Sequence, residues 1–120
     1  MLGPQTHLTA RYMDLLSLTQ SVTASNIANA DTPGYRTLTF DFQSEFRRAL
    51  EDPKGQAGES AAVFEAGLSA VKNDGNDVIL ERELRLMSES AIRFRHAALM
   101  LRGGIRGVRM AIQEGRGAIG

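Results

Sequence analysis

The sequence contains no cysteine, which excludes disulfide bonds and metal sites built from thiolates. It also has no excess of charge of either sign, because 14 basic residues balance 14 acidic ones. The net charge therefore points neither to nucleic acid nor to an anionic membrane as a partner. Long hydrophobic runs are missing too, since no stretch approaches the roughly 18 apolar residues of a membrane-spanning helix. A length of 120 residues fits one domain.

The residue patterns of catalytic and ligand-binding sites are absent as well. His7 and His96 lie far apart in the sequence, and neither has neighbours typical of metal ligands. Gly103, Gly104 and Gly107 make no phosphate-binding loop, because no strand precedes them and no Gly-Lys-Ser/Thr follows. We therefore expect no enzymatic activity, no cofactor and no metal ion.

The first residues lack the features of a secretory signal peptide. Residues 1–14 contain neither an early positive cluster nor an apolar core segment. If the protein leaves the cytoplasm, we expect it to use another export route.

A heptad repeat dominates the C-terminal part of the chain. Apolar residues recur there at alternating steps of four and three, which is the a/d pattern of a coiled-coil seam. The seam consists of Leu80, Leu84, Met87, Ala91, Phe94, Ala98, Leu101, Ile105, Val108 and Ile112. It predicts a helix within residues 77–120 whose heptad part is roughly 55 Å long at 1.5 Å per residue. Asp77 is the expected N-cap, after a turn at Asn73-Asp74-Gly75.

One flank of this predicted helix carries only small side chains. With Leu84 at position a, the following g positions are Ser90, Ala97, Gly104 and Ala111. A neighbouring helix could approach closely along such a flank. The helix could be the core of a small bundle, but apolar residues outside the seam favour neighbours supplied by other chains.

The N-terminal part predicts a second long helix, from residue 5 or 6 to residue 29, with apolar residues at steps of three and four. Alternating residues around Leu38 and Phe40 predict a short strand, and residues 43–50 predict two helical turns. Residues 51–61 have the composition of a loop, and Val63 and Phe64 make a second extended piece.

These elements predict a mainly α fold. We expect an antiparallel, coiled-coil-like pair of long N- and C-terminal helices, with a short irregular, β-containing region between them. The expected parts are residues 1–36 with the first helix and a turn, residues 37–76 as the middle region, and residues 77–120 with the heptad helix. Together they form one structural unit.

The sharpest local signal is the end of the first helix, where the sequence reads SNIANADTPGYR. Pro33 bars the helix from continuing, since it lacks an N–H group and clashes with the preceding turn. Pro33 and Gly34 at the centre of a turn suit type II, in which glycine supplies a positive φ. Asn29 and Asp31 can bond the free backbone groups at the helix end.

This motif resembles the signature of bacterial flagellar rod and hook proteins, an axial protein family. The residues that carry the resemblance are Asn26, Asn29, Thr32, Pro33, Gly34 and Tyr35. The later stretch Asp74-Gly75-Asn76-Asp77-Val78 is similar to the one that opens the C-terminal helix in that family. Within the family, the short length and this later stretch make the chain most similar to the proximal rod type. The resemblance covers most of residues 8–42 and 74–113.

The resemblance implies a structural protein of the flagellar basal body, in the rod that crosses the periplasm. Its terminal helices would assemble into a tubular axial structure that transmits torque and surrounds the export channel. The implied partners are further copies of the chain, other proximal rod proteins, the rod–ring adaptor, the inner-membrane ring and the flagellar type III export apparatus, with no nucleic acid and no membrane span. A soluble helical adaptor outside the flagellum is the alternative, and a nucleic-acid-binding helical protein is a more distant one.

The resemblance also implies an export element of the form Phe-x-x-x-apolar. Phe42, Phe46 and Leu50 have that spacing. Packing of a short helix is the alternative explanation of the same spacing.

Overall fold

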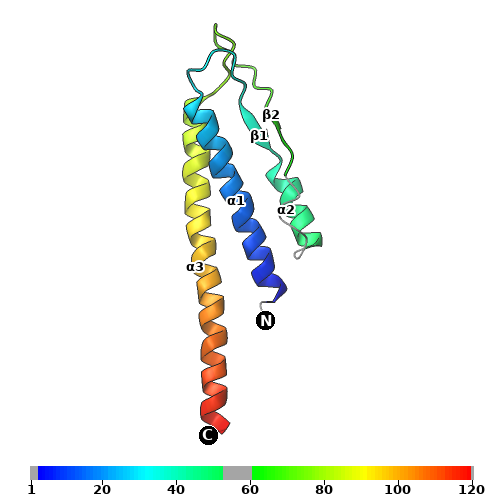
Figure 1. The fold of residues 1–120 in the computed structure, drawn as a ribbon, viewed down its shortest axis with the longest axis vertical. Helices are drawn as coiled ribbons and strands as arrows, with labels where there is room; N and C mark the ends of the chain where they lie inside the picture. The colour runs from blue at the N-terminus through cyan, green and yellow to red at the C-terminus, as the bar shows by residue number, and fades with distance from the viewer. Residues whose placement is uncertain (1–2, 53–60, 120) are drawn as a thin grey trace.

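The computed structural model describes residues 3–52 and 61–119, and in them the chain forms an elongated molecule of 74 × 25 × 16 Å. Its elements in chain order are α1 (Pro4–Ala28), β1 (Leu38–Phe40), α2 (Phe42–Glu51), β2 (Val63–Glu65) and α3 (Leu80–Ile119). Figure 1 shows α1 and α3 packed lengthwise in opposite directions, with both chain termini toward the same end. The predicted mainly α fold with an antiparallel pair of long helices is thereby confirmed.

Helix α1 is rich in threonine, and its hydroxyl groups bond inside the helix. The Oγ1 atoms of Thr9, Thr19 and Thr23 donate to carbonyl oxygens four residues earlier, at 2.8–3.1 Å. Such bonds let a β-branched polar residue lie in a helix without an unsatisfied hydroxyl group. Pro4 lies at the first turn, where its missing N–H group costs nothing.

The contact between α1 and α3 includes small side chains of α3. The buried apolar residues include Leu16 and Val22 on α1 and Ala97 on α3. Ser90, two turns before Ala97, is also buried, with 3 % of its surface exposed. Small residues at this spacing let the two helix backbones lie close together. Because α3 has 40 residues and α1 has 25, the C-terminal part of α3 runs past the N-terminal end of α1 (Figure 1).

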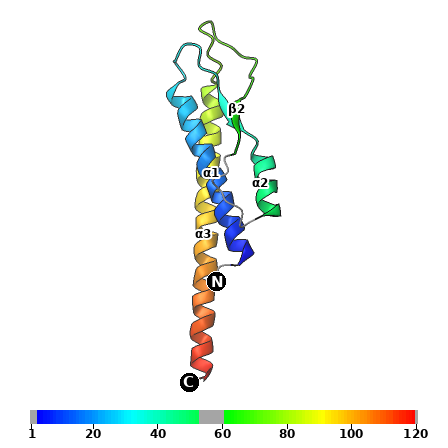
Figure 2. The same cartoon turned by 45° about the vertical axis from the view of Figure 1, so that its right-hand side comes forward.

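The middle region lies beside α1, and Figure 2 shows α2 next to the N-terminal half of α1. Strands β1 and β2 pair antiparallel, with Thr39 opposite Phe64. Asp41 caps α2, since its side chain accepts from the backbone N–H of Ser44. Phe42 and Phe46 of α2 hold this helix on α1, because their rings lie 5.9 and 5.4 Å from the ring of Tyr12.

The start of α3 differs from the sequence prediction. The helix begins at Leu80, and Asp77 lies three residues before it, so the N-cap role predicted for Asp77 is wrong. The physical reason is a competing partner, because the carboxylate of Asp77 accepts hydrogen bonds from Thr37 instead of from the first turn of α3.

Candidate functional site: a buried polar junction

The end of α1 is closed by the predicted turn. Asn29 donates from its backbone N–H and its side-chain amide to the carbonyl of Ser25, which satisfies a free group of the helix end. The N–H of Tyr35 donates to the carbonyl of Thr32, and Gly34 has φ 74°. The predicted positive φ at Gly34 is therefore confirmed.

A second tight turn, before α3, lies directly against the first. The N–H of Gly75 donates to the carbonyl of Lys72, and Gly75 has φ 86°. The N–H of Gly34 donates to the carbonyl of Asp74 at 2.8 Å, so the two turns are joined through their backbones. A Cβ atom on Gly75 would lie 3.4 Å from the Cα of Gly34. Both turns need glycine for its left-handed conformation, and a Cβ atom on Gly75 would be in van der Waals contact with Gly34.

Asn76 connects the segment before α3 to the end of α1. Its amide group donates to the carbonyl oxygens of Asn29 and Thr32, both at 2.9 Å. Its Oδ1 atom accepts from the N–H of Val78 at 2.8 Å. One buried side chain thus satisfies backbone groups from the first helix end, the turn and the entry to α3.

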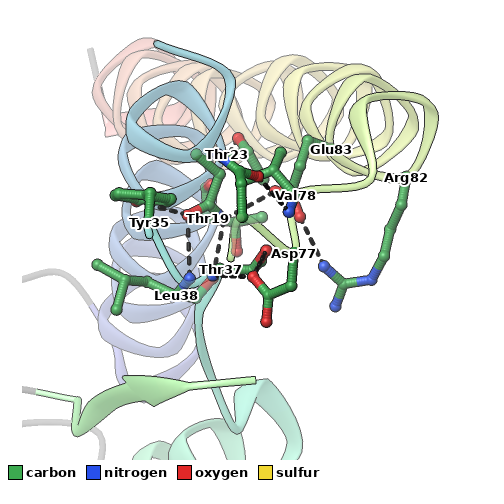
Figure 3. Close-up of polar contacts among 11 residues, drawn as sticks. Thr19, Thr23, Tyr35, Thr37, Leu38, Asp77, Val78, Arg82 and Glu83 are labelled. Carbon is green, nitrogen blue, oxygen red and sulfur yellow. Dashed lines mark hydrogen bonds and ion pairs between the residues drawn. The ribbon is translucent and has the colours of Figure 1, made fainter. Parts of the chain in front are cut away.

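Asn26 is the centre of the junction and is fully buried. Its Oδ1 accepts from the hydroxyl of Tyr35 at 2.9 Å and from the N–H of Leu38 at 3.0 Å. Its amide nitrogen donates to the carbonyl of Leu38 and to Glu83 Oε2, both at 2.9 Å. An asparagine side chain offers two acceptor sites and two donors, and here all four are used. Asn26 therefore binds α1, the turn, β1 and α3 to one another. Figure 3 labels its three partners, Tyr35, Leu38 and Glu83.

Glu83 brings a buried carboxylate from the first turns of α3 to this junction. One of its oxygens accepts from Asn26, and the other, Oε1, accepts from Arg82 Nη1 at 2.6 Å. Both oxygens of a fully buried carboxylate are therefore satisfied, one of them by a cation. A buried charge is tolerated only when it is paired and hydrogen-bonded in this way. The hydrogen bond between Asn26 and Glu83 fixes the register of α3 against α1, since sliding by one turn would separate the two side chains.

A second buried carboxylate, Asp77, holds the start of β1. Its Oδ1 accepts from both the backbone N–H and the hydroxyl of Thr37. Its Oδ2 lies 3.5 Å from Arg36 Nε, an ion pair without a hydrogen bond. Burial by itself would raise the pKa of Asp77, but the hydrogen bonds from Thr37 and the charge of Arg36 outweigh it and lower this pKa below its ordinary value of 3.8.

The lowered pKa of Asp77 predicts a loss of stability in acid. The ionised form is favoured in the folded state, so its contribution is complete above pH 3.8 and is lost as the pH falls through the lower, folded-state pKa. We expect Asp77→Asn to be less stable than the natural chain at neutral pH, and the difference to shrink below about pH 4. Urea unfolding of both chains at several pH values measures this. A stability difference that stays constant from pH 7 to pH 2 would contradict it.

The junction contains the sequence motif together with residues outside it. Of the motif residues, Asn26, Asn29, Thr32, Gly34 and Tyr35 take part in the hydrogen bonds described above, and Pro33 lies in the turn between them. Sequence reasoning missed Glu83 as the partner of Asn26, and Asn76 as the partner of Asn29 and Thr32. It also missed the hydrogen bonds from Thr37 to Asp77. Glu83 falls on the g position one heptad before Ser90, so a charged residue opening a row of small ones was the signal available.

The heptad seam lies mainly beside the contact with α1. Leu80 and Leu84 keep 46 % and 47 % of their surfaces exposed, and Ala91 is exposed as well. Met87, Phe94, Ala98 and Leu101 are half-buried. Of the small flank, Ser90 and Ala97 are buried and Gly104 is exposed. The side chains of Ile105, Val108, Ala111 and Ile112 lie outside the described residues. We call the exposed row formed by Leu80, Leu84 and Ala91 the heptad ridge.

An apolar groove opens on the other side of α3, between α1, α2 and the middle of α3. Its volume is about 390 Å³, and its apolar walls come from Leu8, Tyr12, Phe46, Ile92, Ala97 and Met100. Thr9, Arg93 and His96 complete the lining. Ile92 and Met100 keep 67 % and 68 % of their surfaces exposed, so this subunit leaves the groove uncovered.

No group of three or more histidine, aspartate or glutamate side chains among the described residues could hold a metal ion. No helix in the part of the chain that the structure describes is long and apolar enough to cross a membrane. The junction satisfies its own polar groups, and its evident role is to fix two helices and two turns in one arrangement.

Comparison with known proteins agrees with an architectural role. Residues 13–36, which hold the end of α1 and the turn, match a family described as "Flagella basal body rod protein". The chain is 35 % identical over 98 residues to "Flagellar basal body rod protein FlgB" of Borrelia hermsii, covering 65 % of this chain and 73 % of that protein. It is 27 % identical over 122 residues to the protein of that name from Yersinia enterocolitica, covering 86 % and 89 %. It is 25 % identical over 126 residues to that of Escherichia coli K12, covering 86 % and 88 %.

Proposed function

Because the chain belongs to the FlgB family of flagellar basal body rod proteins, we propose that its helix pair is the unit from which the proximal rod is built. Its role is structural, within the flagellar basal body rod and alongside other rod proteins. The observation that supports the proposal is the combination of a rigid end and an open side. The buried junction fixes α1 and α3 at one end, while the heptad ridge of α3 stays uncovered.

The heptad ridge is the surface that neighbouring subunits would cover. Leu80 and Leu84 expose nearly half of their surfaces, although apolar side chains in a repeating pattern normally pack against a partner helix. Burial of such a side chain contributes about 1.5–3 kcal/mol. A tubular array of helix pairs would bury the ridge on each subunit, surround the export channel and transmit torque along its length.

The proposed partners follow from the position of the family in the basal body. They are further copies of the chain, the other proximal rod proteins, the rod–ring adaptor, the inner-membrane ring, and the flagellar type III export apparatus that delivers the chain. The small flank supports close packing at Gly104, since a Cβ atom there would meet nothing within 4 Å inside the subunit. This open position leaves room for the backbone of a neighbouring helix.

A substitution on the heptad ridge tests the proposal. Leu84→Glu changes an exposed residue, so we expect the free energy of unfolding to change by only about 0.5 kcal/mol. In the array, however, it would bury an unpaired charge in each subunit, so rods should fail to form and cells should not swim. Swimming and basal-body yield are the readouts. Gln43→Glu, at an exposed position of α2, is the matched control and should leave both unchanged. Normal rods in the Leu84→Glu strain would refute the role of the ridge.

The proposed export element can be separated from packing. Phe42 and Phe46 pack on Tyr12 in the folded chain, so an export apparatus would meet them only before α2 docks. Replacing both phenylalanines by alanine is expected to reduce secretion. Tyr12→Ala removes their packing partner and leaves the element intact, so its secretion should stay normal. Equal secretion of the two variants, measured at equal cellular amounts, would leave packing as the sole role of the two phenylalanines.

A further inference from the structure

The side of α3 that points away from α1 is exposed over about five turns of helix. Glu83, Ser90 and Ala97 are buried on the side that faces α1. With 3.6 residues per turn, positions two residues before or after these, and their repeats at seven residues, lie on the opposite side. We call this opposite side the outer face, and its exposed residues are Arg85, Ser88, Ile92, Arg95, Leu99 and Arg102.

The outer face carries an excess of positive charge that the balanced total of the chain conceals. Residues 93–120 hold six of the 14 basic residues and one of the 14 acidic residues. Glu81 lies on the same side at the start of α3, but from Arg85 to Arg102 the outer face has no carboxylate. Glu89 is exposed beside the outer face, so residues 85–102 together hold four arginines and one glutamate.

The arginines of the outer face are not neutralised within the described part of the subunit. Arg85, Arg95 and Arg102 form no ion pair with another described residue. Helix α1, which packs against α3, adds one charge of each sign, at Arg11 and Asp14. The outer face therefore presents net positive charge to whatever it meets.

Two aliphatic side chains lie among these arginines. Ile92 and Leu99 keep 67 % and 56 % of their surfaces exposed, and Arg95 and Arg102 each follow one of them by three residues. Packing against another helix would bury both arginines in the seam, where a coiled coil needs apolar residues. Nucleic acid gains little from aliphatic side chains, and the outer face has no aromatic residue on which a base could stack. A lipid surface accepts both kinds of residue, because aliphatic side chains enter the acyl region while guanidinium groups stay among the headgroups.

We propose that the outer face of the unassembled chain binds the surface of an anionic lipid bilayer. Helix α3 lies in the plane of the surface, with Ile92 and Leu99 inserted and the arginines bound to lipid phosphate groups. Each arginine near an anionic surface raises the affinity about fivefold. The inference concerns the free subunit and does not depend on the proposed rod function, so either can fail without the other.

Sedimentation of the purified full chain with lipid vesicles tests the proposal. One set of vesicles contains phosphatidylglycerol mixed with phosphatidylcholine, and the other contains phosphatidylcholine alone. We expect the chain to sediment with the anionic vesicles only, and to be released by about 1 M salt. Arg95→Gln combined with Arg102→Gln should weaken this binding about twentyfold. Arg47→Gln combined with Arg48→Gln is the matched control, because it removes the same charge from exposed positions of α2 and should leave the binding unchanged.

A second pair of substitutions separates a lipid surface from other anionic partners. Ile92→Ser combined with Leu99→Ser keeps every charge of the outer face but removes the inserted side chains, so it should also weaken binding to the anionic vesicles. Unchanged vesicle binding in this variant, or tighter binding of the natural chain to double-stranded DNA than to the vesicles, would overturn the proposal. So would equal binding to both sets of vesicles, no binding to either, or equal weakening by the two arginine pairs.

Discussion

Replacing Asn26 by alanine is expected to lower the free energy of unfolding by about 3–5 kcal/mol. The change removes four hydrogen bonds at a fully buried position. It leaves the N–H and C=O groups of Leu38 without these partners and one oxygen of Glu83 buried and unpaired. Leaving buried polar groups unpaired costs far more than the net worth of the bonds themselves. Urea unfolding followed by circular dichroism measures the loss.

Two comparisons separate this effect from a general sensitivity of the helix end. Ser25→Ala removes only a 3.4 Å contact with the hydroxyl of Tyr35, so its effect should stay below about 1 kcal/mol. Asn26→Asp keeps the shape of the side chain but turns two donors into acceptors facing Glu83 and the carbonyl of Leu38. It should be at least as destabilising as alanine at neutral pH and recover in acid. A loss for Asn26→Ala no greater than that for Ser25→Ala would mean that Asn26 does not hold the junction together.

Gly34→Val is expected to abolish rod assembly while costing about 1–3 kcal/mol of stability. Gly34 has φ 74°, which a β-branched residue reaches only with strain. A Cβ atom at this position would meet nothing within 4 Å, so the cost is strain in the backbone and not a clash. The strained turn would misdirect Tyr35, whose hydroxyl reaches Asn26. In an array the same error repeats in every subunit, so assembly should fail before folding does.

Gly34→Asn is the matched comparison, because asparagine tolerates the left-handed region better than valine does. We expect the asparagine variant to form rods and support swimming at a higher level than the valine variant. Basal-body yield and swimming speed, measured at equal cellular amounts of both variants, provide the test. Equal assembly of the two variants would show that the left-handed turn is not needed for the rod.

The helix pair could be predicted because its signals are local. The alternating steps of four and three after Leu80 need a helix to place them on one face. Pro33 follows the apolar repeat of the first helix and bars that helix from continuing. The short strand around Leu38 and the helical turns after Phe42 were also visible as alternation and as a pair of aromatic residues four apart. Such patterns follow from neighbouring residues, and the structure contains each of these elements.

The polar junction could not be predicted, because its bonds join residues distant in sequence. Asn26 and Glu83 are 57 residues apart, and no residue pattern near either of them predicts that they meet. For Asp77, a local pattern predicted the wrong hydrogen-bond partner. An acidic residue after a turn and before a heptad run predicts an N-cap, but Thr37, 40 residues earlier, supplies the donors instead. The motif identified the right positions at the helix end without revealing their partners on α3.

The most direct measurement of the central claim is the location of the chain itself. The bacterium that makes it would carry a tagged copy at the natural site, and its hook–basal bodies would be purified and examined by immunoelectron microscopy. The account predicts that the tag lies in the rod near the inner-membrane ring, and that cells lacking the chain have neither rods nor hooks and do not swim. Swimming cells without the chain, or purified basal bodies without the tag, would contradict it.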